Sequence, residues 1–112
     1  MTTEQQSPLP SISLATLPHK GLVRMCPSEC IHVTYGAVTL DFHVREHFDR
    51  LGEVIEEYAG SPEAGIRLRH GHALLSFNAQ EFQEFSGLVH RALDELRRVD
   101  AVRRLLTDGI RS

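Results

Sequence analysis

The sequence predicts an α+β fold made of two tandem β-hairpin–helix repeats, in the order ββαββα. The segment 31–46 (IHVTYGAVTLDFHVRE) aligns with 66–81 (IRLRHGHALLSFNAQE) at an offset of 35, with identical Ile, Gly, Leu, Phe and Glu at five matching places. Apolar residues at helical spacing follow each segment. We therefore expect the two hairpins to form one four-stranded antiparallel sheet with both helices on one face.

Each predicted hairpin turns at a glycine. In the first hairpin the apolar alternation changes phase at Tyr35-Gly36, and the second repeats this arrangement at His70-Gly71. A two-residue type I′ loop takes glycine at its second position, because that position needs a positive φ. This loop placement pairs Val33 with Val38, and it leaves one face of each hairpin apolar.

The two helices are predicted from caps and apolar stripes. Asn78 and Glu81 have the spacing of a capping box, so the second helix should begin near Ala79. Its stripe consists of Phe82, Phe85, Leu88, Val89, Ala92, Leu93 and Leu96. A similar stripe in the first helix starts at Phe48 and ends before Gly60-Ser61-Pro62.

The chain divides into three parts. Residues 1–24 are rich in Pro, Ser, Thr and Gln, and we expect a disordered or loosely docked tail there. Residues 25–98 should form a single domain of two pseudo-repeats, 25–60 and 61–98. Residues 99–112 should form a C-terminal helical extension.

Composition excludes several classes of protein. Two cysteines are too few for a disulfide-dense secreted scaffold, and no apolar run approaches the roughly 18 residues of a membrane span. The first residues also lack the basic and apolar segments of a signal peptide, so we expect a cytoplasmic protein that does not enter membranes. The net charge of −3, and a C-terminal arginine cluster without an aromatic platform, argue against nucleic-acid binding.

The strongest candidate site lies on the face of the first hairpin that points away from the core. Its thiol and imidazole groups belong to Cys26, Cys30, His32, His43 and His47. Asp41 is an alternative ligand, or a partner that orients a ligand. Thiolate, imidazole and carboxylate are the usual ligands of zinc, and the spacing of Cys26 and Cys30 suits it. Copper(I) also binds thiolates. The alternatives are a redox dithiol, or ordinary strand and surface residues with no shared role.

The second hairpin has a different outward face. Arg67, Arg69 and His72 make it basic, which predicts a surface for an anion or an acidic partner. Residues 41–64 carry seven acidic and two basic side chains, whereas 90–112 carry six basic and four acidic ones. These complementary charges favour a homodimer.

The sequence contains no sign of catalytic machinery. It has neither a glycine-rich phosphate loop nor a nucleophile elbow, and Cys30, His32 and Asp41 would stand side by side on an open sheet. We therefore predict a small non-catalytic metal-binding protein, with zinc as the metal. The alternative is a protein–protein interaction module that acts, without metal, through its exposed sheet face and its charged helix faces.

Overall fold

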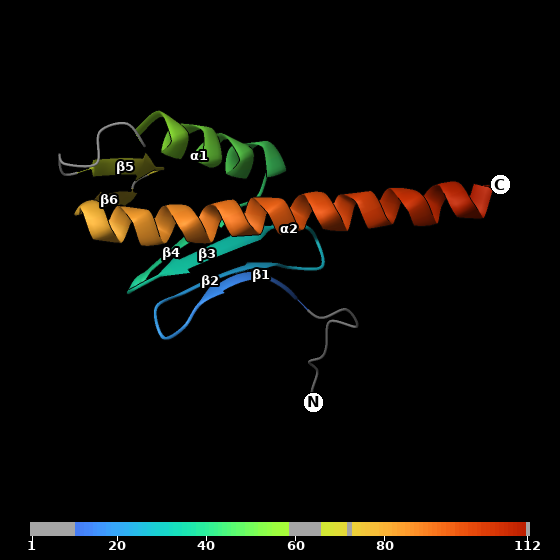
Figure 1. The fold of residues 1–112 in the computed structure, drawn as a ribbon, viewed down its shortest axis with the longest axis horizontal. Coiled ribbons are helices and arrows are strands. Elements are labelled where there is room, and N and C mark those ends of the chain that lie inside the picture. The colour runs from blue at the N-terminus through green and yellow to red at the C-terminus, as the bar shows by residue number, and fades with distance from the viewer. Residues whose placement is uncertain (1–10, 59–65, 72, 112) are drawn as a thin grey trace.

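The computed structural model describes residues 11–58, 66–71 and 73–111, and this part of the chain forms an α+β fold. One sheet has four antiparallel strands in the order β1-β2-β3-β4, and a second sheet has two strands (Figure 1). The strands of the first sheet are β1 (Ile12–Leu17), β2 (Gly21–Met25), β3 (Ile31–Tyr35) and β4 (Val38–Phe42). The remaining elements are β5 (Ile66–His70), β6 (Ala73–Phe77), α1 (Arg45–Tyr58) and α2 (Ala79–Arg111).

One face of the four-stranded sheet is buried, because its strands alternate apolar and polar side chains. Along β3, Ile31, Val33 and Tyr35 are buried, and the two residues between them are only partly covered. Val23 on β2 and Leu40 on β4 pair with Val33 from either side, so the alternation continues across the sheet. The opposite face carries the polar side chains of these strands.

Both helices contribute to the core that covers this buried face. α2 contacts β1 and β2, and α1 contacts β4. The two helices meet at Gly52 of α1, where a Cβ atom would lie only 2.5 Å from Leu93 Cδ1 of α2. Similarly, a Cβ atom at Gly21 of β2 would lie 2.8 Å from Leu88 Cδ2. The absence of a side chain at these two glycines therefore lets α2 pack closely against α1 and against β2.

Aromatic rings join the two sheets into one core. The ring centroid of Tyr35 on β3 lies 5.8 Å from that of Phe77 on β6 and 5.6 Å from that of Phe85 on α2. Phe77 and Phe85 stack at 4.8 Å. The Tyr35 hydroxyl donates a hydrogen bond to Glu84 Oε1 at 3.0 Å, so its polar end is satisfied at the edge of the core.

The structure does not confirm the predicted tandem repeat. The order hairpin–helix occurs twice, but the second hairpin forms a sheet of its own instead of extending the first. The helices also differ, with 14 residues in α1 and 33 in α2. β1 and β2 supply the other two strands of the four-stranded sheet, with β2 paired to β3, in place of the second hairpin that we had expected there.

The prediction of a tail over residues 1–24 is wrong for the part that the structure describes. Residues 12–25 form the hairpin β1–β2, whose turn contains His19 with a φ of 64°. Leu14 and Val23 are buried in the common core. A β-bulge at Leu14 interrupts the pairing between Ser13 and Ala15, and this irregularity hides the alternation of the strand. Residues 1–10 lie outside the described part.

The register of the predicted hairpins is shifted by two residues. Tyr35 pairs with Val38, and the loop is Gly36-Ala37 instead of Tyr35-Gly36. Gly36 has a φ of 60° at the first loop position, which is where a type II′ turn takes glycine. Because side chains alternate with a period of two, a shift of two residues leaves each of them on its predicted face.

The C-terminal third of the chain is one long helix. α2 begins with the expected capping box, in which Glu81 N–H donates to Asn78 Oδ1 at 2.8 Å and Asn78 N–H to Glu81 Oε1 at 2.9 Å. The helix continues through the region predicted as a helical extension to Arg111. In the described part of the chain, no helix is both long and apolar enough to cross a membrane.

Candidate functional site

The turn between β2 and β3 is folded around the sulfur of Cys26. Cys26 N–H donates to the carbonyl of Cys30 at 2.9 Å, and Glu29 N–H donates to the carbonyl of Cys26 at 2.8 Å. Glu29 adopts a φ of 71°, which returns the chain toward β3. Cys30 N–H then donates to Cys26 Sγ at 3.2 Å. The backbone of the turn therefore presents a donor to this sulfur before any ligand binds.

A serine hydroxyl lies against both sulfur atoms. Ser28 Oγ is 3.0 Å from Cys26 Sγ and 3.7 Å from Cys30 Sγ. Both thiols are free and partly buried. The hydrogen bond from Ser28, with further ones from His32 and from the backbone of Cys30 and Ser28, lowers the pKa of Cys26 from 9.0 to about 6. Cys26 is therefore a thiolate at neutral pH, the form that binds metals and reacts with electrophiles.

Two histidines lie beside the cysteines because of the register between β3 and β4. His32 pairs directly with Asp41, and Cys30, one residue before β3, lies near His43, one residue after β4. Cys30 Sγ is 3.5 Å from His43 Nδ1. His32 Nδ1 is 2.6 Å from Asp41 Oδ1, which leaves Nε2 as the ring nitrogen for Cys26.

Charge and hydrogen bonding at this pair change the pKa of each partner. The Asp41 carboxylate, as hydrogen-bond acceptor, raises the pKa of His32 above 6.5, and hydrogen bonding to His32 lowers the pKa of Asp41 below 3.8. The pair therefore favours the ionised carboxylate and the protonated imidazole. Its effect is moderate because half of the Asp41 side chain is exposed to water.

The structure thus brings together four of the five predicted thiol and imidazole groups: Cys26, Cys30, His32 and His43. Asp41 lies next to His32, as expected for a partner that orients a ligand. His47 lies on α1 and lines a different groove, together with Arg50, Arg67 and Arg69. In the described part of the chain, no three His, Cys, Asp or Glu side chains are arranged to hold a metal ion. The hydroxyl of Ser28 lies against both sulfurs, where a shared ion would have to sit.

Sequence reasoning missed two residues of this turn. Ser28 is the hydroxyl that contacts both thiols, and its position midway between the two cysteines was the available signal. Glu29 forms an ion pair of 3.6 Å with Arg103, which attaches the turn to the C-terminal part of α2. The contact between Glu29 and Arg103 joins segments far apart in the chain, so no local sequence pattern could predict it.

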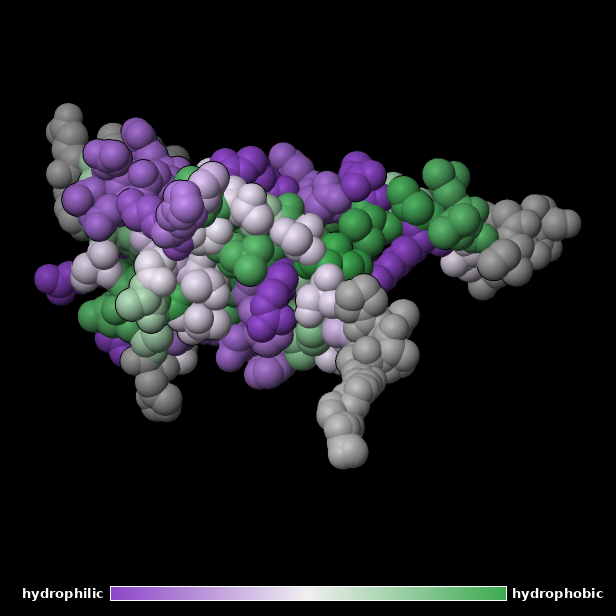
Figure 2. All heavy atoms as spheres, turned by 90° about the horizontal axis from the view of Figure 1, so that it is seen from below, coloured by the Kyte–Doolittle hydropathy of each residue, from purple (hydrophilic) through white to green (hydrophobic). Residues whose placement is uncertain are grey.

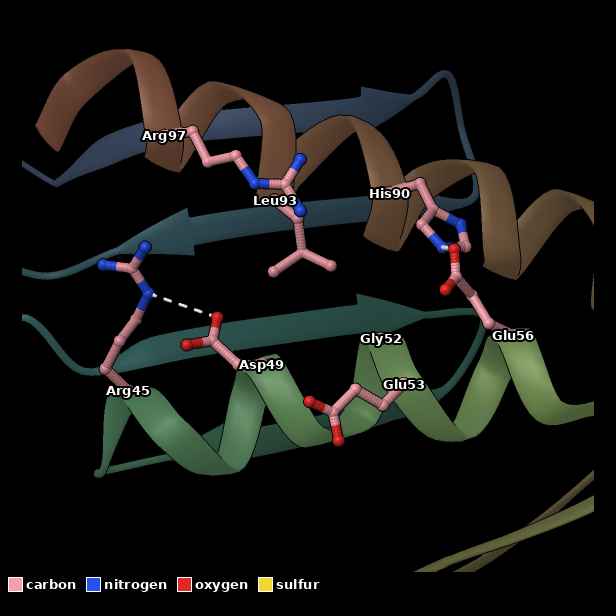
Figure 3. A pocket seen from close by; sticks show the side chains of 8 residues that line it. All are labelled: Arg45, Asp49, Gly52, Glu53, Glu56, His90, Leu93 and Arg97. Carbon is pink, nitrogen blue, oxygen red and sulfur yellow. Dashed lines mark ion pairs between the residues drawn. The ribbon is translucent and has the colours of Figure 1, made fainter. Parts of the chain in front are cut away.

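Two grooves lie on either side of α1. The first has a volume of about 360 Å³ and is lined by α1 and α2, with carboxylates from Asp49, Glu53 and Glu56; of these, Glu56 lies beside His90 and Asp49 beside Arg45 (Figure 3). His90 Nε2 is 3.7 Å from Glu56 Oε2. The second groove, of about 160 Å³, lies between α1 and β5 and contains both arginines of the predicted anion face, Arg67 and Arg69. The third residue of that face, His72, lies outside the described residues.

The C-terminal part of α2 carries exposed apolar side chains. Val102, Leu105 and Leu106 are 45%, 72% and 64% exposed. Figure 2 shows apolar side chains gathered on this end of the helix, where it extends beyond the sheets.

A scan of protein-family models and searches of curated proteins and of solved structures found no match to this chain.

Proposed function

We propose that this protein binds a zinc ion at the turn between β2 and β3. Cys26, Cys30, His32 and His43 are the four ligands in this proposal, and Asp41 orients His32. The set is of the Cys₂His₂ type, which is common in structural zinc sites. Such a site would attach the turn to β3 and to the end of β4. The proposed role is binding and stabilisation, without catalysis.

The observation that carries the proposal is the distance between Cys30 Sγ and His43 Nδ1, which is 3.5 Å. In a tetrahedral site with Zn–S of about 2.3 Å and Zn–N of about 2.0 Å, a sulfur and a nitrogen ligand are about 3.5 Å apart. The two atoms therefore have the separation that a shared zinc ion requires.

The pair of His32 and Asp41 supports the same interpretation. Histidines that bind zinc usually donate their second ring N–H to a carboxylate, which fixes the tautomer and the orientation of the ring. Asp41 accepts from Nδ1 of His32 at 2.6 Å, so Nε2 would face the metal. Losing such an outer partner weakens metal affinity by about 10–100-fold.

Binding requires the side chains of the turn to rearrange, because no three ligand-type side chains of the described residues are arranged to hold a metal ion. The Ser28 hydroxyl has to turn away so that an ion takes its place against the two sulfurs. Cys26 is already ionised at neutral pH, so its thiolate needs no deprotonation on binding. His32, whose pKa is raised by Asp41, has to be neutral to bind a metal, so zinc binding should release protons and strengthen as the pH rises from 6 to 8.

The test is zinc stoichiometry and affinity for the untagged protein, measured by native mass spectrometry and by competition with a chromophoric chelator. We expect one zinc ion per chain, loss of binding in Cys26→Ser, and at least about tenfold weaker binding in His43→Asn. His47→Asn is the matched control, because this histidine lies in another groove, and it should bind zinc like the wild type. A folded protein that takes up no zinc, or a His43→Asn variant with unchanged affinity, would refute the proposal.

The exposed apolar end of α2 favours a second candidate function, that of an interaction module. The partner we propose for this surface is a second copy of the chain, because basic side chains flank the apolar residues whereas α1 is acidic. Analytical ultracentrifugation of the wild type and of Leu105→Glu separates the outcomes. A wild-type dimer that the substitution converts to monomer supports this function, and a monomeric wild type at high concentration contradicts it.

A further inference from the structure

The groove between α1 and β5 collects basic side chains from two elements. His47 and Arg50 come from α1, and Arg67, Arg69 and His70 come from β5. No acidic side chain is among its lining residues, whereas three carboxylates line the groove on the other side of α1. We propose that this groove binds a small organic carboxylate whose body is apolar. The site is separate from the proposed zinc turn and does not depend on it.

Two arginines are placed to hold the carboxylate. Arg67 and Arg69 alternate along β5, so their side chains leave the same side of the strand about 6.6 Å apart. Both are exposed, and none of the ion pairs formed within the described part of the chain involves either of them. Arg50 is engaged with Glu53 at 3.1 Å. The planar guanidinium group binds carboxylates through two parallel hydrogen bonds, which suits it to this role.

The backbone of β5 adds donors at the same place. Within the described residues β5 pairs only with β6, and His70 pairs with Ala73 next to the two-residue loop. The two residues that flank such a loop form a hydrogen-bonded pair, and from there hydrogen-bonded and non-hydrogen-bonded pairs alternate along the two strands. Arg67 and Arg69 belong to non-hydrogen-bonded pairs. The N–H groups of Arg67 and Arg69 therefore point away from β6, toward the free edge of β5. These two amides are available to a carboxylate in addition to the guanidinium groups.

The floor and the far wall of the groove are apolar. Leu51, Val54 and Tyr58 of α1 line it, and Tyr58 is 39% exposed. Phe42 lies below, with its ring centroid 4.3 Å from that of His70. His70 is itself fixed, because its Nε2 is 3.0 Å from the carbonyl oxygen of Asp41. A ligand with a charged head and an apolar body would match both parts of this lining.

The volume of the groove limits the ligand to a small molecule. Its space of about 160 Å³ is close to the cavity of about 150 Å³ that accommodates benzene in another protein. A single ring or a short branched chain therefore fits, together with one carboxylate at the arginines. Benzoate has this size and chemistry, and it serves as the probe.

The test is a titration of the ¹⁵N-labelled full chain with sodium benzoate, followed by heteronuclear NMR. We expect saturable shifts confined to α1, β5 and the neighbourhood of Phe42, with a dissociation constant of about 1 mM or tighter. Benzamide has the same shape without the charge, and inorganic phosphate has charge without an apolar body. Each should bind at least about tenfold more weakly than benzoate.

Variants of exposed arginines complete the design. Arg69→Gln should weaken benzoate binding at least about fivefold, whereas Arg98→Gln on the exposed surface of α2 should leave it unchanged. Circular dichroism verifies that both variants remain folded. The proposal is overturned if benzoate does not saturate, if benzamide or phosphate binds as tightly, or if Arg69→Gln and Arg98→Gln have equal effects.

Discussion

The ionisation of Cys26 gives the sharpest test of the turn between β2 and β3. Ser28 makes the largest contribution to the low pKa of this thiol, which is about 6 instead of 9.0. At pH 7 about nine-tenths of such a thiol is thiolate, against about one-hundredth of an unperturbed one. Replacing Ser28 by alanine removes the hydroxyl donor but keeps the backbone donors. We therefore expect the pKa of Cys26 to rise part of the way toward 9.0.

The measurement needs a chain with one thiol, so Cys30→Ser serves as the background; its backbone N–H still donates to Cys26. The rate of alkylation by iodoacetamide in metal-free protein, followed from pH 4.5 to 10, gives the midpoint of ionisation. A rise of one pKa unit lowers the thiolate fraction at pH 6.5 about threefold. Ser76→Ala, at an exposed serine on β6, is the control and should not move the midpoint.

Two results would refute the reasoning. If the midpoint in the background chain lies near 9, the hydrogen bonds around Cys26 do not stabilise its thiolate. If the midpoint lies near 6 but Ser28→Ala leaves it there, Ser28 is not the cause of the low pKa.

Three other predictions concern stability, each measured as the free energy of unfolding in urea. Gly52→Ala should cost about 1–2 kcal/mol, because the new methyl group overlaps Leu93; an equal cost in a Leu93→Ala background would contradict this. Asp41→Asn should cost up to about 1 kcal/mol between pH 4 and 6.5, where Asp41 is ionised and His32 is protonated. The cost should be smaller at pH 9, because His32 loses its proton, and with it the attraction to Asp41, as the pH rises through its raised pKa. Equal costs at pH 5.5 and 9 would exclude the ion pair as the cause. Asn78→Ala should cost about 1 kcal/mol through loss of the helix cap, and an unchanged stability would show that the cap is dispensable.

Local patterns predicted the faces of the hairpins but not their register. The alternation of Ile31, Val33 and Leu40 was sufficient to place them in the core, since any even shift preserves the face. The position of the loop depends on which turn type Gly36 adopts, and type I′ and type II′ both take glycine. With the observed turn Asp41 is the direct cross-strand partner of His32, whereas the predicted turn made it a diagonal neighbour.

Pairing between distant segments was beyond the sequence patterns. Nothing in the second hairpin indicates whether it joins the first or forms its own sheet, because both arrangements bury the same apolar face. The strand β1 combines a bulge with serine and threonine side chains, so it lacked the period of two on which strand prediction depends. A continuous alternation from Val23 through Met25 was the signal available for β2.

The metal-binding role of the candidate site stays a prediction, but the closeness of its residues has a local origin. Cys26, Cys30, His32 and His43 lie together because a short turn and a single strand pair fix their positions, and both are local features. The separation of His47 is the exception. α1 begins at Arg45, and the helix carries His47 away from the turn, into the groove between α1 and β5.

The long helix α2 also sets the order in which this chain can fold. The strands β1 to β4 are complete by Phe42, yet their apolar face is covered largely by a helix that begins at Ala79. The earliest segment of the sheet, β1, thus depends on the latest one for its core. Such non-local dependence slows folding and leaves an apolar sheet surface exposed while the chain is being synthesised. Fragments that end before α2 should consequently aggregate instead of forming an independent sheet.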